Sequence, residues 1–347
     1  MRQEKIKVMI WGFGAMGKGM AQMIAHKQGF QILGAVDMNP ALIGKSIKEL
    51  ISDYAEDARI ASSVTDIPHW ERADICLLAT DSFTEKAYPK IEWLVKHGIN
   101  VISTAEQMAY PYAANPELSK KMDELAKAYH VRILGTGVNP GMMMDLLVLF
   151  LTGVMSDVKN IEVSRVNSLS PFGKAVMEEQ GVGLSIEEYD AKCTQISGHI
   201  GFWESISMMS EGLGLKDVVV SQTMKPIITD VDRTSPHGFA KAGHVCGIDM
   251  EAEGVKDGKT FFHLHHPQQI EPHLGGITTG DYITLAGSPN IKMSISPEVE
   301  GGMGTIAICV NMIPLLLNAT PGLKTMLDLP VPRAICGDVR ALVEEKI

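Results

Sequence analysis

Cysteine is scarce in this sequence of 347 residues, and its placement excludes a cross-linked framework. The cysteines are Cys76, Cys193, Cys246, Cys309 and Cys336. They are scattered, odd in number and without CxxC spacing, which argues against disulfides and against a zinc module. The pattern favours a reducing compartment, so we expect a cytoplasmic protein in which Cys76, inside an apolar run, is an ordinary core residue.

Positive charge is also in short supply. Lys and Arg number 31 against 41 Asp and Glu, which gives a formal net charge of −10. A surface this acidic repels phosphate backbones and anionic lipids, so we expect neither nucleic acid nor a membrane as a partner. No secretory h-region precedes the first apolar run at Ile6. The most apolar stretch, 141–155, is too short to span a bilayer and carries Asp145, so we expect a buried helix there.

Internal repeats and low-complexity linkers are absent as well. Hydrophobic residues make up 45% of the chain and charged residues 21%, which is the balance of a globular protein and not of a disordered chain. The length allows about two domains with sizeable cores. Motifs and hydrophobic patterning therefore carry the rest of the prediction.

The most informative feature present is a glycine-rich turn between two apolar runs. It follows the run 6–11, opens an amphipathic stretch at 16–26, and precedes a second run, 32–36, that ends in Asp37. The residues of the turn are Gly12, Phe13, Gly14, Ala15, Met16 and Gly17. The first glycine permits a tight turn, the second lets the backbone approach a pyrophosphate, and the third lets helix and strand pack closely. The order strand, turn, helix, strand and acid predicts a nicotinamide-dinucleotide site. The alternative is a glycine turn in an ordinary α/β unit.

Asp37 indicates which dinucleotide the site would take. Its carboxylate would accept hydrogen bonds from the adenosine ribose hydroxyls and would repel a 2′-phosphate, which favours NAD. Lys45 lies near enough in the sequence to compensate for that repulsion, so NADP stays possible.

Apolar runs and amphipathic stretches alternate over residues 1–140. We predict strands at 6–11, 32–36, 74–79, 99–103 and 131–135, with helices between them that include 84–97 and 116–129. Such alternation predicts an α/β domain with a doubly wound parallel sheet of the Rossmann type. Ligands of such sheets bind at the carboxyl ends of the strands.

The pattern changes after about residue 156, and we predict a second, mixed α+β domain over 141–304. Its expected strands lie near 161–166 and at 243–249, 260–266, 281–286 and 290–296, mostly antiparallel. Ser185 and Glu188 form a capping box that opens a helix, and a longer helix is expected at 195–212. We expect the apolar tail 305–318 to be helical despite Pro314. It would complete the first domain, which would then consist of 1–140 and 305–347.

Small and polar residues follow three of the predicted strands. They are Thr80 with Ser82, Thr104, and Gly137 with Asn139. If they gather at one edge of the sheet, their hydroxyl and backbone groups can hold the ribose and the carboxamide of the cofactor, so we predict them as cofactor-binding. The alternative is that they belong to ordinary βα turns, with Thr80 or Asp81 as cap residues.

Three residues are candidates for substrate chemistry. Glu106 follows the strand at 99–103 and could bind a cationic amine or accept its proton, although a helix first-turn acid is an equal alternative. His199 could act as a base or a substrate anchor, sharing a helix face with Trp203, or it could be structural. Arg165 interrupts the apolar alternation of its strand and could clamp a substrate carboxylate, or it could lie on the solvated face.

A group of histidines invites comparison with a metal site. Its members are His263, His265, His266 and His273. His263 and His265 would share one face of a strand, but no carboxylate or cysteine joins them at a recognisable spacing, and hydride transfer needs no metal. We therefore predict no metal, and an exposed strand face near a subunit contact instead.

Longer motifs resemble a known family. The 2,4-diaminopentanoate dehydrogenases are similar to this chain in VMIWGFGAMGKGMA, AVDMNPALIGK, GTGVNPGMMMD, GHIGFWES and GTIAICVNMIPLLLNATPGLKTMLDLP. They belong to the dihydrodipicolinate-reductase-like and diaminopimelate-dehydrogenase-like superfamily. The resemblance implies a Rossmann domain, a mixed-sheet domain for substrate binding and dimerisation, an NAD(P) cofactor and a homodimer. It also implies oxidative deamination of the 4-amino group of 2,4-diaminopentanoate, in ornithine degradation, to 2-amino-4-oxopentanoate, ammonium and reduced cofactor.

The chain departs from two relatives in that superfamily. The pair His265-His266 is followed by Pro-Gln-Gln-Ile, which does not support the chemistry of dihydrodipicolinate reductases. Homoserine dehydrogenases carry a lysine after the strand that here ends near Thr104, whereas this chain has Glu106 in that region. A carboxylate suits a small diamino-acid substrate that arrives as an ammonium.

The resulting hypothesis gives Glu106 or His199 the role of base and Arg165 the role of carboxylate partner. One alternative is a related amine or amino-acid dehydrogenase, or an imine reductase, acting on another cationic substrate. An alternative from another class is a nucleotide sensor without catalysis.

Overall fold

The computed structural model describes residues 2–51, 54, 56–192, 194–196 and 198–344. Contacts between residues divide the chain into two compact units. The first unit is Met1–Met142 with Gly301–Ile347, and the second is Met143–Glu300. The limits expected from the sequence, 140 and 305, lie a few residues from these.

Seven parallel strands of the described chain form the sheet of the first unit, in the order β16-β6-β5-β4-β1-β2-β3. They are β1 (Ile6–Trp11), β2 (Phe30–Val36), β3 (Ile60–Ala61), β4 (Ile75–Leu78), β5 (Asn100–Ser103), β6 (Arg132–Gly135) and β16 (Gly322–Lys324). The direction in which successive strands are added to the sheet reverses between β1 and β4, and this switch point is where sheets of this kind bind ligands. The predicted doubly wound parallel sheet is confirmed.

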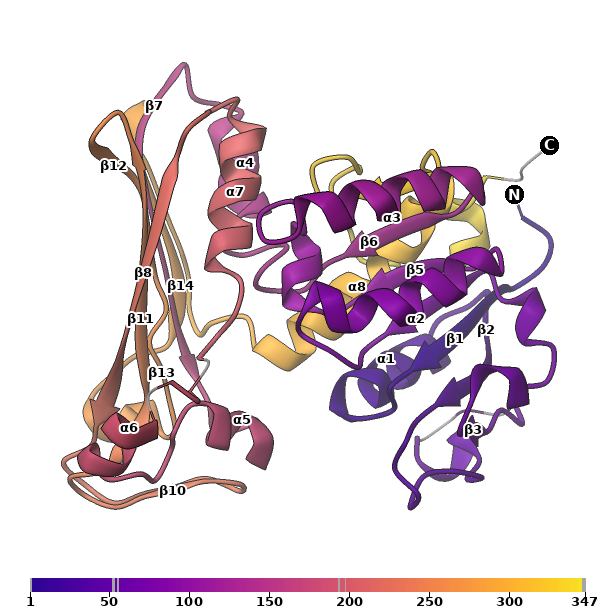
Figure 1. Ribbon diagram of the computed structural model, residues 1–347, viewed down its shortest axis with the longest axis horizontal. Coiled ribbons are helices and arrows are strands. Elements are labelled where there is room, and N and C mark those ends of the chain that lie inside the picture. The colour runs from indigo at the N-terminus through magenta and orange to yellow at the C-terminus, as the bar shows by residue number, and fades with distance from the viewer. Residues whose placement is uncertain (1, 52–53, 55, 193, 197, 345–347) are drawn as a thin grey trace. The chain divides into compact units, whose positions relative to one another are not determined.

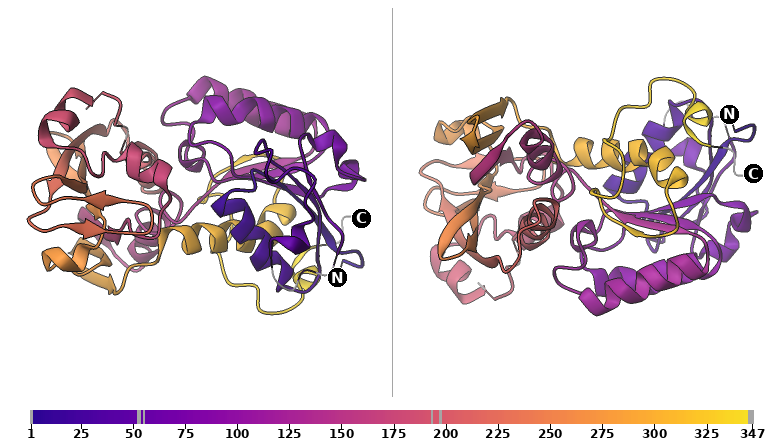
Figure 2. Two further views of the ribbon diagram at one scale, coloured as in Figure 1. Left: turned by 90° about the horizontal axis from the view of Figure 1, so that it is seen from below. Right: turned by 90° about the horizontal axis from the view of Figure 1, so that it is seen from above.

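Helices cover both faces of this sheet (Figure 2). They are α1 (Ala15–Ala25), α2 (Thr84–Lys96), α3 (Pro116–Ala128) and α8 (Gly301–Asn318), with short 3-10 helices η1 (Ile47–Glu49), η2 (Val64–Asp66), η3 (Trp70–Arg72), η4 (Glu106–Ala109) and η6 (Val339–Leu342). The helix α1 packs against α8, and α2 packs against α3. Because both faces are covered, β4, β5 and β6 are buried along their whole length. Side chains with accessible chemistry can therefore lie only at the strand ends.

The helix α8 contains Pro314 and is strongly apolar, as the sequence predicts. Among the described residues it is the one helix long and apolar enough to cross a membrane, with a mean hydropathy of 1.5. That is weak evidence for a membrane span, because the core helices of globular domains pass the same test. Within its unit α8 packs on α1, β5 and β6, and it buries Cys309, Val310 and Ile313 completely.

The second unit contains a mixed sheet. Seven of its described strands pair in the order β12-β11-β13-β7-β14-β15, with β8 beside β11. They are β7 (Asp157–Ser168), β8 (Val219–Ile228), β11 (Val245–Lys256), β12 (Lys259–His265), β13 (Gln268–Gln269), β14 (Gly280–Ser288) and β15 (Ile291–Ile295), while β9 (Arg233–Thr234) pairs separately with β10 (Phe239–Ala240). Most pairs are antiparallel, but β7 runs parallel to β12 and β13. The predicted mixed domain is confirmed. The strand β8 is not among those predicted from the sequence, because its exposed residues and internal Pro226 are typical of an edge strand.

Helices of the second unit are short. They are α4 (Leu146–Thr152), α5 (Lys174–Glu179), α6 (Ile186–Lys192) and α7 (Phe202–Gly212), with the 3-10 helix η5 (Pro272–Gly275). The helices α4 and α7 contact each other and lie against one face of the sheet (Figure 1). The predicted capping box before α6 is confirmed. Ser185 Oγ accepts from the Glu188 N–H at 3.2 Å, and Glu188 Oε2 accepts from the Ser185 N–H at 2.9 Å.

Two helix predictions in this unit are wrong in extent. The helix expected at 195–212 begins at Phe202, because Gly198 and Gly201 adopt φ values of +62° and +139° that no helix accommodates. Residue 197 of the predicted range lies outside the described residues. The stretch 141–155 forms only α4 and is not a buried helix, since Phe150 is 61% exposed.

The described cysteines are unpaired: Cys76, Cys246 and Cys309 are buried and Cys336 is exposed. Cys76 is a core residue of β4, as the sequence predicts, and burial raises the pKa of its thiol. Cys193 lies outside the described residues.

Candidate cofactor and substrate sites

The glycine-rich turn lies at the switch point of the parallel sheet, between the ends of β1 and β4. Gly12 adopts φ +93° and its N–H donates to the carbonyl of Val36 at 2.8 Å. A Cβ at Gly12 would lie 2.4 Å from the carbonyl oxygen of Ala79, and a Cβ at Gly17 would lie 1.8 Å from that of Gly12. Both positions therefore require glycine for steric reasons alone.

Gly14 differs from the other two glycines. No described heavy atom outside its own chain neighbours lies within 4 Å of the position its Cβ would take. Gly14 is also the N-cap of α1, and neither a capping side chain nor a first-turn acid satisfies that helix end in the described chain. Open space in front of uncapped helix N–H groups fits a pyrophosphate, because the helix N-terminus carries partial positive charge. The residues present thus fit a dinucleotide.

Asp37 follows β2 and is held by the backbone on both carboxylate oxygens. Oδ2 accepts from the N–H of Phe13 at 2.6 Å, and Oδ1 accepts from the N–H of Asn39 at 2.8 Å. Each oxygen keeps further lone-pair capacity, so the half-buried carboxylate can still accept from ribose hydroxyls. Lys45 is exposed in the loop after Asp37.

The loops after β4 and β5 meet at the same edge of the sheet. A Cβ at Gly12 would lie 2.9 Å from Cγ2 of Thr80, so the glycine turn and this loop are in contact. Thr80 Oγ1 donates to Asp81 Oδ2 at 2.5 Å, and Lys90 donates to the same oxygen at 2.7 Å. The alternative of Thr80 or Asp81 as a helix cap is wrong, because α2 has Phe83 as its N-cap, without a capping side chain.

Backbone contacts tie Ser82 and Thr104 to this edge. The carbonyl of Ser82 accepts from the Gln107 N–H at 3.1 Å, and the Thr104 N–H donates to Leu78 at 3.0 Å. Glu106 is the first residue of η4 and is half-buried. Both hypotheses for Glu106, a proton acceptor and a first-turn acid, remain compatible with this position.

The loop that follows β6 is tied to α8. The N–H of Val138 donates to Thr305 Oγ1 at 3.2 Å, and a Cβ at Gly137 would lie 3.5 Å from the same oxygen. Asn139 is buried and precedes a cis peptide bond to Pro140. The predicted cofactor residues that follow β1, β4, β5 and β6 therefore belong to adjacent parallel strands and share one sheet edge.

Arg165 is buried in the second unit, on β7. It is 2% exposed, so the alternative of a solvated-face position is wrong. Its Nη1 forms an ion pair with Asp281 of β14, and its Nη2 donates to the carbonyl of Val299 at 2.5 Å. The N–H of Val299 in turn donates to Asp281 Oδ2 at 2.9 Å. The predicted clamp on a substrate carboxylate would therefore have to share the guanidinium with Asp281.

His266, which the sequence analysis does not single out for this role, connects Arg165 with His199. Its Nδ1 lies 2.6 Å from the carbonyl of Arg165, and its ring meets that of His199 edge to face with centroids 5.0 Å apart. Burial, with the charge of Arg165 second, lowers the pKa of His199 to about 4. Burial also holds the pKa of His266 well below its usual range, with the neighbouring His199 and Arg165 adding to the effect. Both imidazoles are therefore neutral at neutral pH.

His199 precedes α7 and is not part of it. The expected helix face shared with Trp203 is therefore wrong, and Trp203 is 49% exposed. Asp281 and His266 could have been found only through strand pairing, because Asp281 lies opposite Arg165 in the β14–β7 register. Sequence periodicity does not give that register.

The remaining histidines have carboxylate neighbours that the sequence analysis does not anticipate. His265 Nε2 lies 2.7 Å from Asp249 Oδ1, and His263 Nε2 lies 3.3 Å from Glu251 Oε2. Both carboxylates come from the neighbouring strand β11, and strand pairing, which no recognisable sequence spacing reveals, brings them to these histidines. His273 is exposed, 3.6 Å from Glu271.

A parallel sheet with a glycine turn at its switch point, joined in one chain to a mixed-sheet unit, is an architecture found in dinucleotide-dependent oxidoreductases of the Rossmann type. The family model of the 2,4-diaminopentanoate dehydrogenase C-terminal domain matches residues 142–345, and that of the dihydrodipicolinate reductase N-terminus matches residues 6–128. The chain is 53% identical to a 2,4-diaminopentanoate dehydrogenase of Acetoanaerobium sticklandii, over 99% of this chain and 98% of that protein. It belongs to the 2,4-diaminopentanoate dehydrogenase family, and the resemblance seen in its motifs is confirmed.

More distant relatives match this chain along almost its whole length. An amine dehydrogenase of Streptomyces virginiae is 23% identical over 95% of this chain and 98% of its own length. The solved structure of an amine dehydrogenase from Mycobacterium smegmatis superposes with a TM-score of 0.86 at 23% identity, covering 97% of this chain and 99% of that one. This structural likeness shows a common fold for both units.

Proposed function

We propose that this protein is an NAD(P)-dependent amine dehydrogenase that deaminates 2,4-diaminopentanoate to 2-amino-4-oxopentanoate and ammonium, a step of ornithine degradation. The observation that carries the proposal is the identity of 53% to a 2,4-diaminopentanoate dehydrogenase along 99% of the chain. Motifs of the glycine turn and of the second unit are both inside that match.

The cofactor is expected to bind along the carboxyl edge of the parallel sheet. Its role is to accept a hydride from the carbon that bears the reacting amine. The turn from Gly12 to Gly17 and the N-terminus of α1 would hold the pyrophosphate, because open space and uncapped N–H groups coincide there at the switch point of the sheet. Asp37 would accept from the ribose. Thr80, Ser82, Thr104, Gly137 and Asn139 would surround the nicotinamide end.

Glu106 is the better candidate for the base. A protonated amine cannot release hydride, so a proton must leave the substrate ammonium first. A carboxylate attracts that cation, whereas the neutral His199 lies beside the positive charge of Arg165. We assign the proton transfer to Glu106 accordingly.

His199, His266 and Arg165 of the second unit suit the carboxylate of an amino acid. Two imidazole rings and a guanidinium offer N–H donors to an anion, and Asp281 already balances the charge of Arg165. A bound carboxylate would favour the protonated form of the imidazoles, so substrate binding would take up a proton. The pH dependence of substrate affinity is a direct measure of this role.

A spectrophotometric assay of purified protein tests the function. NAD or NADP is mixed with a panel of diamino acids and simple amines, and reduced cofactor and free ammonium are both measured. We expect 2,4-diaminopentanoate to give both products in equal amounts. A response only to another amine would point instead to a related amine dehydrogenase, as the full-length likeness to the Streptomyces enzyme allows. Silence with saturable cofactor binding would identify a nucleotide sensor.

A homodimer and a cytoplasmic location complete the proposal. The unpaired state of the described cysteines supports a reducing compartment. Light scattering coupled to size exclusion gives the number of subunits, and a mass equal to one chain of 37.7 kDa would exclude the dimer.

A further inference from the structure

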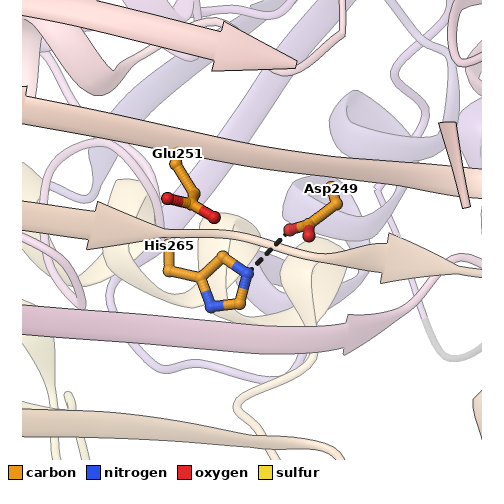
Figure 3. Close-up of side chains that lie close together, drawn as sticks. All are labelled: Asp249, Glu251 and His265. Carbon is orange, nitrogen blue, oxygen red and sulfur yellow. Dashed lines mark hydrogen bonds and ion pairs between the residues drawn. The ribbon is translucent and has the colours of Figure 1, made fainter. Parts of the chain in front are cut away.

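Two strands of the second unit bring three metal-ligating side chains together. Asp249 and Glu251 lie on β11, and His265 lies on β12, where it pairs directly with Glu251. Their potential ligand atoms all lie within 4.8 Å of one another. Figure 3 shows the two carboxylates gathered beside the imidazole ring, with the contact between Asp249 and His265 marked.

The alternation of β11 explains why these residues meet. Ile248, Met250 and Ala252 are buried in the core, so the acids between them point to the opposite face of the sheet and stay half-exposed. His265 pairs with Ser164 on β7, one residue before the buried Arg165. Because successive residues of a strand point to opposite faces, the cluster and Arg165 lie on different faces of this sheet. Nothing in the proposed dehydrogenase chemistry uses the cluster.

We propose that Asp249, Glu251 and His265 form a binding site for a divalent transition-metal ion, with Zn²⁺ as the best match. One imidazole nitrogen and two carboxylate oxygens are ligands that Zn²⁺ takes in proteins. Mg²⁺ and Ca²⁺ prefer sites made of oxygen alone, so the imidazole selects against them. Bound water would complete the coordination.

The distances permit this site after small side-chain rotations. Ligand atoms around a tetrahedral Zn²⁺ lie roughly 3.3 Å apart, given bonds of about 2.0–2.2 Å. His265 Nε2 and Asp249 Oδ1 are closer than that, at 2.7 Å, and the widest separation in the cluster is within 4.8 Å. The ion would replace the hydrogen bond between His265 and Asp249 and draw Glu251 inward.

Neighbouring side chains support the ligands. Ser164 Oγ lies 3.5 Å from His265 Nδ1. A metal bound to Nε2 would leave Nδ1 to form this second contact, which orients the ring. His263 Nε2 lies 3.3 Å from Glu251 Oε2, where it can form a hydrogen bond to that carboxylate. Asp249, Glu251 and Glu253 lie on the same face of β11, so a bound cation would reduce the repulsion between their carboxylates.

Isothermal titration of the chelator-treated, full-length protein tests the site. We expect Zn²⁺ to bind with a stoichiometry of one per chain and Mg²⁺ to give no heat at the same concentration. His265→Ala and Asp249→Asn should each remove the Zn²⁺ isotherm. His273→Ala is the matched control, because His273 is an exposed histidine beside Glu271 in the same unit and lies outside the cluster.

Copper gives a second readout that reports the ligand atoms. The electron paramagnetic resonance spectrum of bound Cu²⁺ should show coupling to imidazole nitrogen in the unchanged protein and in His273→Ala, and should lose it in His265→Ala. Thermal melting of each variant without metal checks that it folds. The proposal is overturned if Zn²⁺ binds His265→Ala and Asp249→Asn as it binds the unchanged protein, or if Mg²⁺ binds equally well, which would mark an unselective acidic surface.

Discussion

The two sheets of this protein place their polar side chains by opposite rules. In the first unit the strands are parallel and covered on both faces, so β4, β5 and β6 are buried from end to end. In the second unit buried and accessible residues alternate along the strands, and along β7 the buried Val163 and Arg165 lie between exposed or half-buried neighbours. Accessible chemistry is therefore confined to strand ends in the first sheet, whereas the second carries it along the strands.

This difference separates two kinds of site. A strand-end site is assembled from loops that each follow an apolar run, so its members can be listed from the sequence. A site along antiparallel strands depends on which residues face each other across the sheet. Arg165 with Asp281 and His265 with Asp249 are pairs of this second kind.

The largest expected effect concerns a strand-end residue. Glu106→Gln keeps the size of the side chain but removes the proton acceptor, so kcat should fall about 10²- to 10⁴-fold. Cofactor affinity, measured by calorimetry, should stay the same. Glu117→Gln on α3 is a matched control, because Glu117 is exposed in the first turn of that helix. Normal turnover in Glu106→Gln would remove this residue from the mechanism.

The next effect concerns a residue within a strand. Arg165→Met leaves Asp281 as an uncompensated buried charge, and we expect a loss of about 3–5 kcal/mol in the free energy of unfolding. Urea denaturation measures it. The double variant Arg165→Met with Asp281→Asn removes the stranded charge and should recover part of the loss. A double variant no more stable than the single one would show that packing, and not charge, dominates.

Acid should destabilise the second unit through His199 and His266. A histidine has a usual pKa near 6.5, and the folded-state pKa of His199 is about 4. Between these two pH values His199 is mostly protonated in the unfolded chain and mostly neutral in the folded protein. Its contribution to stability is complete above about pH 6.5 and is lost as the pH falls toward 4, at up to about 1.4 kcal/mol per pH unit. His266 acts in the same direction. His265 acts in the opposite one, because its hydrogen bond to Asp249 raises its pKa.

Urea midpoints at about pH 7 and about pH 5 measure this slope. His199→Gln should flatten it, because glutamine does not titrate. His69→Gln should leave it unchanged, since that side chain is 73% exposed. An identical slope in the unchanged protein and in both variants would mean that the pKa of His199 is the same in the folded and the unfolded state.

Much of the first unit could be predicted from the sequence because its signals are local. The apolar runs mark β1, β2, β4, β5 and β6 within one or two residues, and the glycine turn is where the pattern places it. The strands β3 and β16 have two and three residues, too few to show a period, and they exist because neighbouring strands pair with them. The predicted cofactor loops share an edge for the same local reason.

Less of the second unit could be predicted, because register is not a local property. Arg165 was recognisable as a charge within an apolar alternation, but Asp281 and His266 meet it only through pairing of distant segments. The carboxylates beside His265 come from β11 in the same way. The start of α7 was mistaken because the positive φ of Gly201 cannot be read from hydrophobic periodicity.

The smallest expected effect concerns cofactor choice at a strand end. Asp37→Asn removes the negative charge that would face a 2′-phosphate but keeps an oxygen for one of the two backbone N–H groups now bound. Repulsion between charges about 4 Å apart is worth roughly 1–4 kcal/mol near a protein surface, so the ratio of NADP to NAD use should rise about tenfold or more. Steady-state kinetics with both cofactors measure it. Asp81→Asn is the control, because Asp81 follows β4 and already pairs with Lys90. If the ratio moves equally in both variants, general surface charge sets the preference. If only Asp37→Asn shifts the ratio of NADP to NAD use, a single carboxylate at the end of β2 selects the cofactor. That result would agree with accessible chemistry being confined to strand ends in the first sheet.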